Sequence, residues 1–347
     1  MRKKRYTEPL QKNRPLRKFA FWESYRESDV DSLEEFISIS SIRIILLIAK
    51  IIQLYSELCL SYILTENDGR RIMAKMKSGD IGTDRAADKI RDIEVTLDFT
   101  PNADASVLYR QGETMVLACA TVAPSLPRWF PRDANRGWVH AEYSLLPGST
   151  DSRFQRERRG AKGRTQEIER LVARSLRGAI DLEALGPIAI TVDCDVLNAD
   201  GGTRCASITA ASIAMRLCVR RLIVSGRCLP ADKRLSHDQI KSGMEAPTLS
   251  TEEALAHENA VIPHDLAAIS VGLIDGDVYT DLDYILDSNA DVDMNVVMTA
   301  DGKFVEVQGT GEEFTYTREE LDALLDAATA GVTSLNEMQV RVLDGIE

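Results

Sequence analysis

The feature that most restricts the fold is a change of hydrophobic period along residues 165–224. Apolar residues between 165 and 181 recur at helical spacing, whereas those between 187 and 197 alternate with polar ones, which is typical of a strand. Residues 206–224 are again largely apolar and predict a buried helix. A chain that passes from helix to strand to helix through one core must pack helices against a sheet.

Hairpin signals surround this segment on both sides. Asp275-Gly276 joins apolar runs at 269–274 and 278–284, and Asp301-Gly302 joins 295–299 to 304–307. Earlier strands are expected at 93–97, at 106–109 and at 114–122, the last one buried on both faces. A capping box, Thr317 with Glu320, opens a last helix over about 318–330. Hairpins mixed with strand–helix–strand units indicate an α+β fold.

One domain is expected over residues 76–347, because no repeat or low-complexity linker divides it. Within it, the stretch 229–265 is polar with weak periodicity, and we interpret it as a surface insertion. Six cysteines without metal-ligand spacing are interpreted as reduced core thiols of a cytoplasmic protein.

Residues 1–75 form an N-terminal extension, basic at first and apolar-rich over 36–64. Charged residues at positions 43, 50 and 57 break the apolar run, so the pattern favours an amphipathic helix over a membrane span. Three interpretations stay open. In the first, translation starts at Met73 or Met76 and the extension is not part of the functional protein. In the second, the helix binds a membrane surface or a partner, and in the third it spans a membrane.

Charge is distributed unevenly along the chain. The net charge is -12, which argues against a protein that coats nucleic acid without specificity. Between Arg153 and Arg177, however, nine basic residues and three acidic ones give a local charge of +6. A concentrated basic segment of this kind is suited to the backbone of a nucleic acid.

Two arginines stand at predicted helix starts. Asp200-Gly201-Gly202-Thr203-Arg204 lies between a strand and a helix, where paired glycines, a hydroxyl and a guanidinium can converge on a phosphate. Gly163-Arg164-Thr165 repeats the arrangement at the start of the preceding helix. A tight turn with solvated arginines is the alternative interpretation of both.

A third constellation is acidic. Five aspartates fall within thirteen residues, from Asp281 to Asp293, and all-oxygen ligands suit Mg²⁺ or Mn²⁺. The alternative is an acidic surface loop, but Leu282, Ile285 and Leu286 between the carboxylates require burial.

At these residues the chain resembles the ribonuclease PH family of phosphate-dependent exoribonucleases. Asp193 to Arg204 (DCDVLNADGGTR) and Asp287 to Met298 (DSNADVDMNVVM) are similar to two of its signatures. The segments 137–143, 163–177 and 304–310 follow the family in the same order, so the resemblance covers about residues 83–342. It implies a single ribonuclease PH-type α+β domain, similar to domain 2 of ribosomal protein S5.

The resemblance also implies an activity and a set of residues. Inorganic phosphate, as co-substrate, attacks the 3′-terminal phosphodiester of tRNA precursors and releases nucleoside diphosphates. Motif by motif, phosphate is assigned to Arg164, Gly202, Thr203 and Arg204, and a divalent cation to Asp287 and Asp293. Catalysis is assigned to Arg204, Asp287 and Asp293, and RNA contacts to Arg153, Arg156, Arg158 and Arg159. Asp200 is expected to support Arg204.

Assembly and location follow from the same resemblance. The family implies a homohexamer, a trimer of dimers, in the cytoplasm, and no stable membrane association is expected for residues 76–347. Gly148, where relatives carry an arginine, and a shorter segment before Arg164 indicate a difference in RNA contacts. Two other functions stay open: a catalytically silent RNA-binding subunit of an exosome-like ring, and a metal-dependent hydrolytic nuclease.

Overall fold

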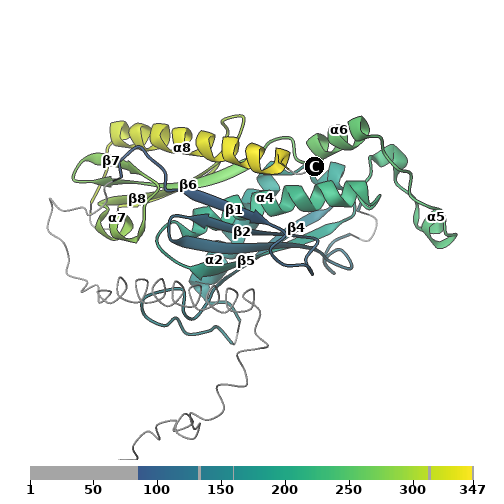
Figure 1. Ribbon diagram of the computed structural model, residues 1–347, viewed down its shortest axis with the longest axis horizontal. Helices are drawn as coiled ribbons and strands as arrows, with labels where there is room; N and C mark the ends of the chain where they lie inside the picture. Colours follow the sequence, from purple (N-terminus) through teal and green to yellow (C-terminus); the bar gives the residue numbers. More distant parts are fainter. Residues whose placement is uncertain (1–84, 132–133, 159, 312–313, 346–347) are drawn as a thin grey trace, which may run out of the picture. The chain divides into compact units, whose positions relative to one another are not determined.

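A computed structural model describes residues 85–131, 134–158, 160–311 and 314–345, which belong to one compact unit (Figure 1). The predictions for residues 1–75, including the start at Met73 or Met76 and the amphipathic helix, lie outside these ranges. Within them, no helix combines the length and the apolar character that a membrane crossing requires.

The first sheet has five strands: β1 (Ile93–Leu97), β2 (Ala105–Gln111), β3 (Thr114–Val122), β4 (Trp138–Leu145) and β5 (Ala189–Asn198). Strands β3 and β5 position the candidate site. The strand order in the sheet is β1-β2-β3-β5-β4, and β4 runs parallel to β5 whereas the other pairs are antiparallel. The parallel pair requires a crossover, which α2 (Gly163–Ala179) and the short α3 (Leu182–Leu185) supply.

The second sheet is antiparallel. It contains β6 (Leu266–Ile274), β7 (Asp277–Thr280), β8 (Val292–Thr299) and β9 (Phe304–Gly311) in the order β7-β6-β8-β9. The short helix α7 (Tyr284–Asn289) follows β7 and returns the chain to β8. Both predicted hairpin turns form, with φ of +53° at Asp275, +87° at Gly276 and +83° at Gly302.

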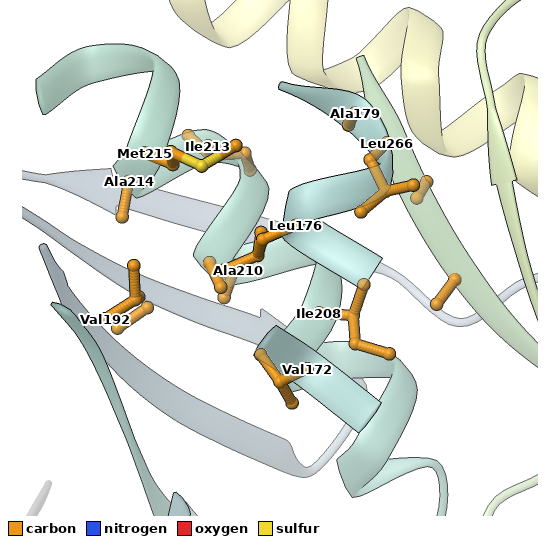
Figure 2. Packing of buried hydrophobic residues seen from close by; sticks show 14 of the residues in the cluster. Val172, Leu176, Ala179, Val192, Ile208, Ala210, Ile213, Ala214, Met215 and Leu266 are labelled. Atoms are coloured by element: carbon orange, nitrogen blue, oxygen red, sulfur yellow. The ribbon is translucent and has the colours of Figure 1, made fainter. Parts of the chain in front are cut away.

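Helix α4 (Thr203–Val224) joins the two sheets, because it contacts β2, β3 and β5 of the first and β6 of the second (Figure 1). It is buried on nearly every side, as its uniformly apolar sequence predicts. Val172 and Leu176 of α2, Val192 of β5 and Ile208 and Ile213 of α4 meet in the common core (Figure 2). The long α8 (Arg318–Asp344) covers the other face of the second sheet.

The segment 229–265 is only partly the surface insertion that was predicted. It contains a 3₁₀ turn (Ala231–Lys233), α5 (His237–Lys241) and α6 (Thr251–Val261). Glu258 on α6 is buried and accepts hydrogen bonds from Arg216 at 3.1 Å and Arg220 at 2.9 Å. The weak periodicity hid this anchor, since it depends on a buried carboxylate and not on an apolar stripe.

Three local predictions were wrong, each for a physical reason. The strand expected over 278–284 ends at Thr280, because Asp281 adopts a φ of +61° and the chain turns away from the sheet. Strand β3 is buried on one face only. Helix α8 continues beyond residue 330 through Gly331, where an added Cβ would lie 2.4 Å from Ile269 Cδ1, so the glycine permits close packing and is no stop signal.

Candidate active site

The start of α4 is shaped to receive an anion. Gly201 and Gly202 have φ values of +74° and +62°, and Gly202 is the N-cap residue without a side-chain cap. A Cβ at Gly201 would lie 2.4 Å from the backbone carbon of Asp283, so only glycine fits there. The first turn of α4 carries no acidic residue, so its N–H groups and its positive dipole end are left for an anionic ligand.

Hydrogen bonds from several segments hold this loop. Arg91 Nη1 donates to the Asp200 carbonyl at 2.6 Å, and Thr114 Oγ1 donates to the Gly201 carbonyl at 2.7 Å. The Tyr284 N–H donates to Asp200 Oδ1 at 3.4 Å, which ties the loop to the start of α7. The glycine loop is therefore positioned from β3 of the first sheet, from the start of α7 and from the segment ahead of β1.

Arg91 and Asp281 form a buried ion pair that the sequence did not predict. Their side chains are 9% and 2% exposed, and Arg91 Nη2 lies 2.6 Å from Asp281 Oδ1. Burial alone would raise the pKa of Asp281, but the hydrogen bonds and the charge of Arg91 outweigh it and hold that pKa below its ordinary value. Asp281 is therefore an internal counter-ion, and it does not belong to the predicted metal site.

Arg204, at the second position of α4, has an unsatisfied donor. Its Nε is buried and has no hydrogen-bond acceptor within the described part of the chain. Its Nη2 lies 3.9 Å from Glu167 Oε1, and that carboxylate accepts a hydrogen bond from Gln308 Nε2 at 2.8 Å. A buried guanidinium N–H without an acceptor is the arrangement that a phosphate oxygen would complete.

Arg164 lies at the start of α2, which like α4 lacks a side-chain cap and an acidic first turn. Tyr143 on β4 connects the two arginines. Its hydroxyl donates to Thr203 Oγ1 at 3.0 Å. Burial raises the pKa of Tyr143, and that hydrogen bond and the charges of Arg164 and Arg204 offset the rise only in part. Arg164, Thr203 and Arg204 therefore all lie near the Tyr143 hydroxyl.

Asp287 and Asp293 approach the same end of α4 from α7 and β8. Cys205, next to Arg204, is within electrostatic range of both Arg204 and Asp287: burial raises its pKa most, and the charge of Asp287 adds to the rise. Cys205 Sγ also donates to Asn295 Oδ1 at 3.1 Å. Asp293 precedes Asn295 by two residues on β8, so both side chains lie on the same face of the sheet.

The fit of these aspartates to a cation rests on the chemistry of their donor set. The described residues contain no group of three or more side chains that could hold a metal ion. Mg²⁺ commonly binds one or two carboxylates and completes its shell with water and substrate phosphates, and Asp287 is exposed enough for such ligands to approach. The two aspartates therefore fit a cation whose remaining ligands are water molecules and phosphate oxygens.

The arginine-rich segment ahead of α2 lines a hollow of the surface. Arg153, Arg156, Arg158 and Lys162 contribute to its wall, and Arg159 lies outside the described residues. The carboxylate of Glu157 crosses this segment to the start of α2, where it accepts from the Lys162 N–H at 3.0 Å and from Thr165 Oγ1 at 3.2 Å. The basic segment is thereby attached to the helix that carries Arg164.

The sequence matches a family of known proteins over both sheets of the fold. The 3′ exoribonuclease family, domain 1, matches residues 89–220, and domain 2 of the same family matches residues 266–331. Ribonuclease PH of Rhodopirellula baltica is 46% identical over 256 residues, which are 74% of this chain and 94% of the relative. The chain belongs to the ribonuclease PH family. It is thus one of the phosphorolytic 3′ exoribonucleases.

Other relatives support the family and the fold. Ribonuclease PH of Corynebacterium kroppenstedtii is 46% identical over 261 residues, 75% of this chain and 91% of that protein. Among solved structures, rice Rrp46 has a TM-score of 0.54 at 15% identity and covers 75% of this chain and 98% of its own. An Archaeoglobus fulgidus exosome with RNA bound to the active site has a TM-score of 0.55 at 20% identity, covering 73% of this chain and 90% of that chain. The last two show the fold alone.

Proposed function

We propose that this ribonuclease PH family member trims the 3′ ends of tRNA precursors by phosphorolysis in the cytoplasm. The observation that carries the proposal is the buried Nε of Arg204, which has no acceptor among the described residues and lies between the starts of α2 and α4, neither of which has a side-chain cap. We assign inorganic phosphate to Arg164, Arg204, Thr203 and the backbone at Gly202.

The chemistry is the transfer of the 3′-terminal nucleotidyl group to inorganic phosphate. An oxygen of inorganic phosphate forms a bond to the phosphorus of the 3′-terminal phosphodiester, and the bond from that phosphorus to the preceding 3′ oxygen breaks. A nucleoside diphosphate leaves, and the freed 3′ oxygen takes up a proton, for which Asp287 and Asp293 are the candidate donors.

Charge repulsion between two anions is the main obstacle. The guanidinium groups of Arg164 and Arg204 neutralise and orient the attacking phosphate, and the α4 start adds oriented N–H groups. We propose that Asp287 and Asp293 hold Mg²⁺ or Mn²⁺, which would neutralise charge on the scissile phosphate when bound.

RNA and assembly complete the proposal. The hollow lined by Arg153, Arg156 and Arg158 would hold the RNA backbone without reading its sequence, and we assign Arg159 to the same contact from the family pattern. Residues 76–347 form the catalytic unit, and six copies assemble as a trimer of dimers. Residues 1–75 are not required for the reaction.

The test separates phosphorolysis from its two alternatives. A 3′-extended tRNA is incubated with Mg²⁺, with and without inorganic phosphate, and the released nucleotides are identified. Nucleoside diphosphates formed only with phosphate are the expected result. Monophosphates formed without phosphate would identify a hydrolytic nuclease, and RNA binding without any product would identify a silent ring subunit.

Arg204→Ala is expected to lower the phosphate-dependent rate about 10²- to 10³-fold while the dissociation constant for RNA changes little, since one oriented donor is lost at the phosphate. Arg221→Ala is the matched control, because Arg221 lies near the far end of the same helix and pairs with Asp98 at 2.6 Å on the surface. Equal rates for the Arg204 variant and wild type would show that Arg204 does not bind the phosphate.

A further inference from the structure

An aromatic cluster stands at the end of the first sheet opposite the phosphate site. Trp129 is 67% exposed, on the loop that leads from β3 to β4. Its ring meets Phe130 edge-on at 5.3 Å between centroids and Trp138 at 5.0 Å and 90°. Trp129 is thus largely exposed while it contacts two further rings, and a cluster of aromatic rings of this kind offers apolar area for contact with a partner.

Arginines surround this cluster. Arg177 lies over the Trp138 ring at 4.6 Å, and Arg136 lies over the Phe130 ring at 5.4 Å. Arg128, beside Trp129, is exposed. In a chain of net charge -12, the loop from residue 123 to residue 137 contains three arginines and one aspartate. The chemistry favours a partner that combines negative charge with flat rings.

On either side of residues 132–133 the loop is anchored: Phe130 is buried and its N–H donates to the Pro127 carbonyl at 2.8 Å, and further contacts hold residues 135–137. The Gly137 N–H donates to the Leu182 carbonyl at 2.7 Å, and a Cβ at Gly137 would lie 2.5 Å from the Ile188 carbonyl oxygen. Arg234 of the insertion reaches Asn135 O at 3.4 Å. Because Trp129 is already packed against the rings of Phe130 and Trp138, stacking of a further ring on it costs less side-chain entropy than it would on an isolated tryptophan.

Two elements lead from this cluster to the phosphate site. On β4, Trp138 and Tyr143 are five residues apart, about 17 Å in an extended strand. On α2, Arg177 and Arg164 are thirteen residues apart, about 20 Å along a helix. Stacked nucleotides of one strand are about 3.4 Å apart, so roughly five of them cover this distance.

We propose that Trp129 is a stacking platform for a base of the RNA substrate, upstream of the 3′-terminal nucleotide held at the phosphate site. Single-stranded RNA is commonly bound by stacking of its bases on aromatic rings, with basic side chains along the backbone. The platform lies apart from the arginine-rich segment at the start of α2, and it adds affinity only for RNA long enough to reach it. This inference rests on the proposed function for the direction of the RNA.

The test compares two oligoadenylates, one of three nucleotides and one of roughly a dozen, with Trp129→Ala, Trp129→Phe and wild type. The alanine variant is expected to raise the ratio of KM for the long to KM for the short RNA by about 5- to 150-fold, the range for loss of one stacked base. Phenylalanine keeps a stacking face and is expected to restore most of the ratio. Phe99→Ala is the matched control, since Phe99 is 50% exposed next to β1 at the opposite edge of the sheet.

Three outcomes would overturn the proposal. An unchanged ratio would remove the stacking contact, and an equal rise of KM for both lengths would place Trp129 at the reacting end. If wild type sediments as an assembled particle and the Trp129→Ala variant sediments as smaller species, the cluster belongs to a contact between protein subunits.

A separate readout keeps this result independent of the catalytic proposal. Long oligoadenylate without phosphate is expected to quench more tryptophan fluorescence in wild type than in Trp129→Phe, because only the former has an indole on the platform. If wild type fails to release diphosphates but this difference persists, the proposed function fails and the platform stands. If diphosphates form and the difference is absent, the reverse holds.

Discussion

Replacing Arg91 with alanine is expected to destabilise the protein and to weaken phosphate binding together. The side chain of Asp281, 2% exposed, accepts from Arg91 Nε at 2.9 Å, from Nη2 at 2.6 Å and from the Arg91 backbone N–H at 2.7 Å. Arg91→Ala removes the first two donors and the positive charge but leaves the carboxylate buried.

The magnitude follows from that burial. Removing one partner of a buried ion pair typically lowers the free energy of unfolding by about 3–5 kcal/mol, because the remaining charge is not compensated. Arg110→Ala is the matched control on the neighbouring strand β2: Arg110 is 39% exposed and pairs with Glu113 at 3.0 Å. A surface pair of this kind contributes about 0–1 kcal/mol.

The pH dependence has a defined sign. The pKa of Asp281 in the folded protein is lower than its ordinary value, so the pair stabilises the fold above the ordinary carboxyl pKa of about 4. That contribution is lost as the pH falls below about 4 toward the folded pKa. Arg91→Ala should therefore show a smaller difference in stability from wild type at pH 3 than at pH 7.

The assay is urea unfolding at one fixed protein concentration, combined with KM for phosphate. KM is expected to rise because Arg91 also holds the Asp200 carbonyl at 2.6 Å and thus the glycine loop. The double change Arg91→Met with Asp281→Leu should recover much of the stability, since an apolar pair leaves no buried charge, but not the phosphate affinity. A loss below about 1 kcal/mol in Arg91→Ala, or an unchanged KM, would refute this reasoning.

Two further predictions concern the rest of the fold. Glu258→Ala should lower the free energy of unfolding by about 3 kcal/mol and speed hydrogen exchange in α6, because the side chain of Arg216, which is 10% exposed, loses a buried partner. Glu252→Ala is the control, since Glu252 is exposed on the same helix. Equal stability of the two variants would contradict the prediction. Among the five described cysteines, Cys119 should react first with a thiol reagent at pH 8. Burial raises the pKa of Cys228 to about 11 and that of Cys218 to about 12. It also raises the pKa of Cys119, but of the five thiols only Cys119 is partly exposed to solvent. Mass spectrometry that finds Cys205 or Cys194 modified first would contradict this prediction.

Local patterns in the sequence predicted the parts of the fold that depend on local contacts. Helix α2 begins at Gly163 and β5 at Ala189, each within two residues of the predicted start, and the capping box of Thr317 and Glu320 forms as expected. The residues proposed to bind phosphate could also be chosen from the sequence, because Thr203 and Arg204 directly follow the glycine pair that turns the chain into α4. Neighbours in sequence that act together leave a readable signal.

The contacts between segments that are distant in the sequence left no such signal. Arg91 and Asp281 are separated by 190 residues, and an isolated arginine ahead of β1 has no pattern that announces a buried partner. The same holds for Tyr143, whose hydroxyl meets Thr203 only because β4 pairs with β5. Asp281 was counted with the aspartates after the hairpin, since only its left-handed turn and its burial separate it from Asp287.

The anchoring of the insertion has a practical consequence for engineering. Arg234 fastens one end to the carbonyls of Glu183 and Leu229, and Glu258 fastens the other to α4, whereas residues 241–248 between them are exposed to solvent. A peptide inserted within residues 241–248 would lengthen a loop whose two ends are already anchored, so the insertion adds little to the entropic cost of closing the loop. An affinity tag at this position would allow intact particles to be captured without altering either chain end or the residues around Arg204.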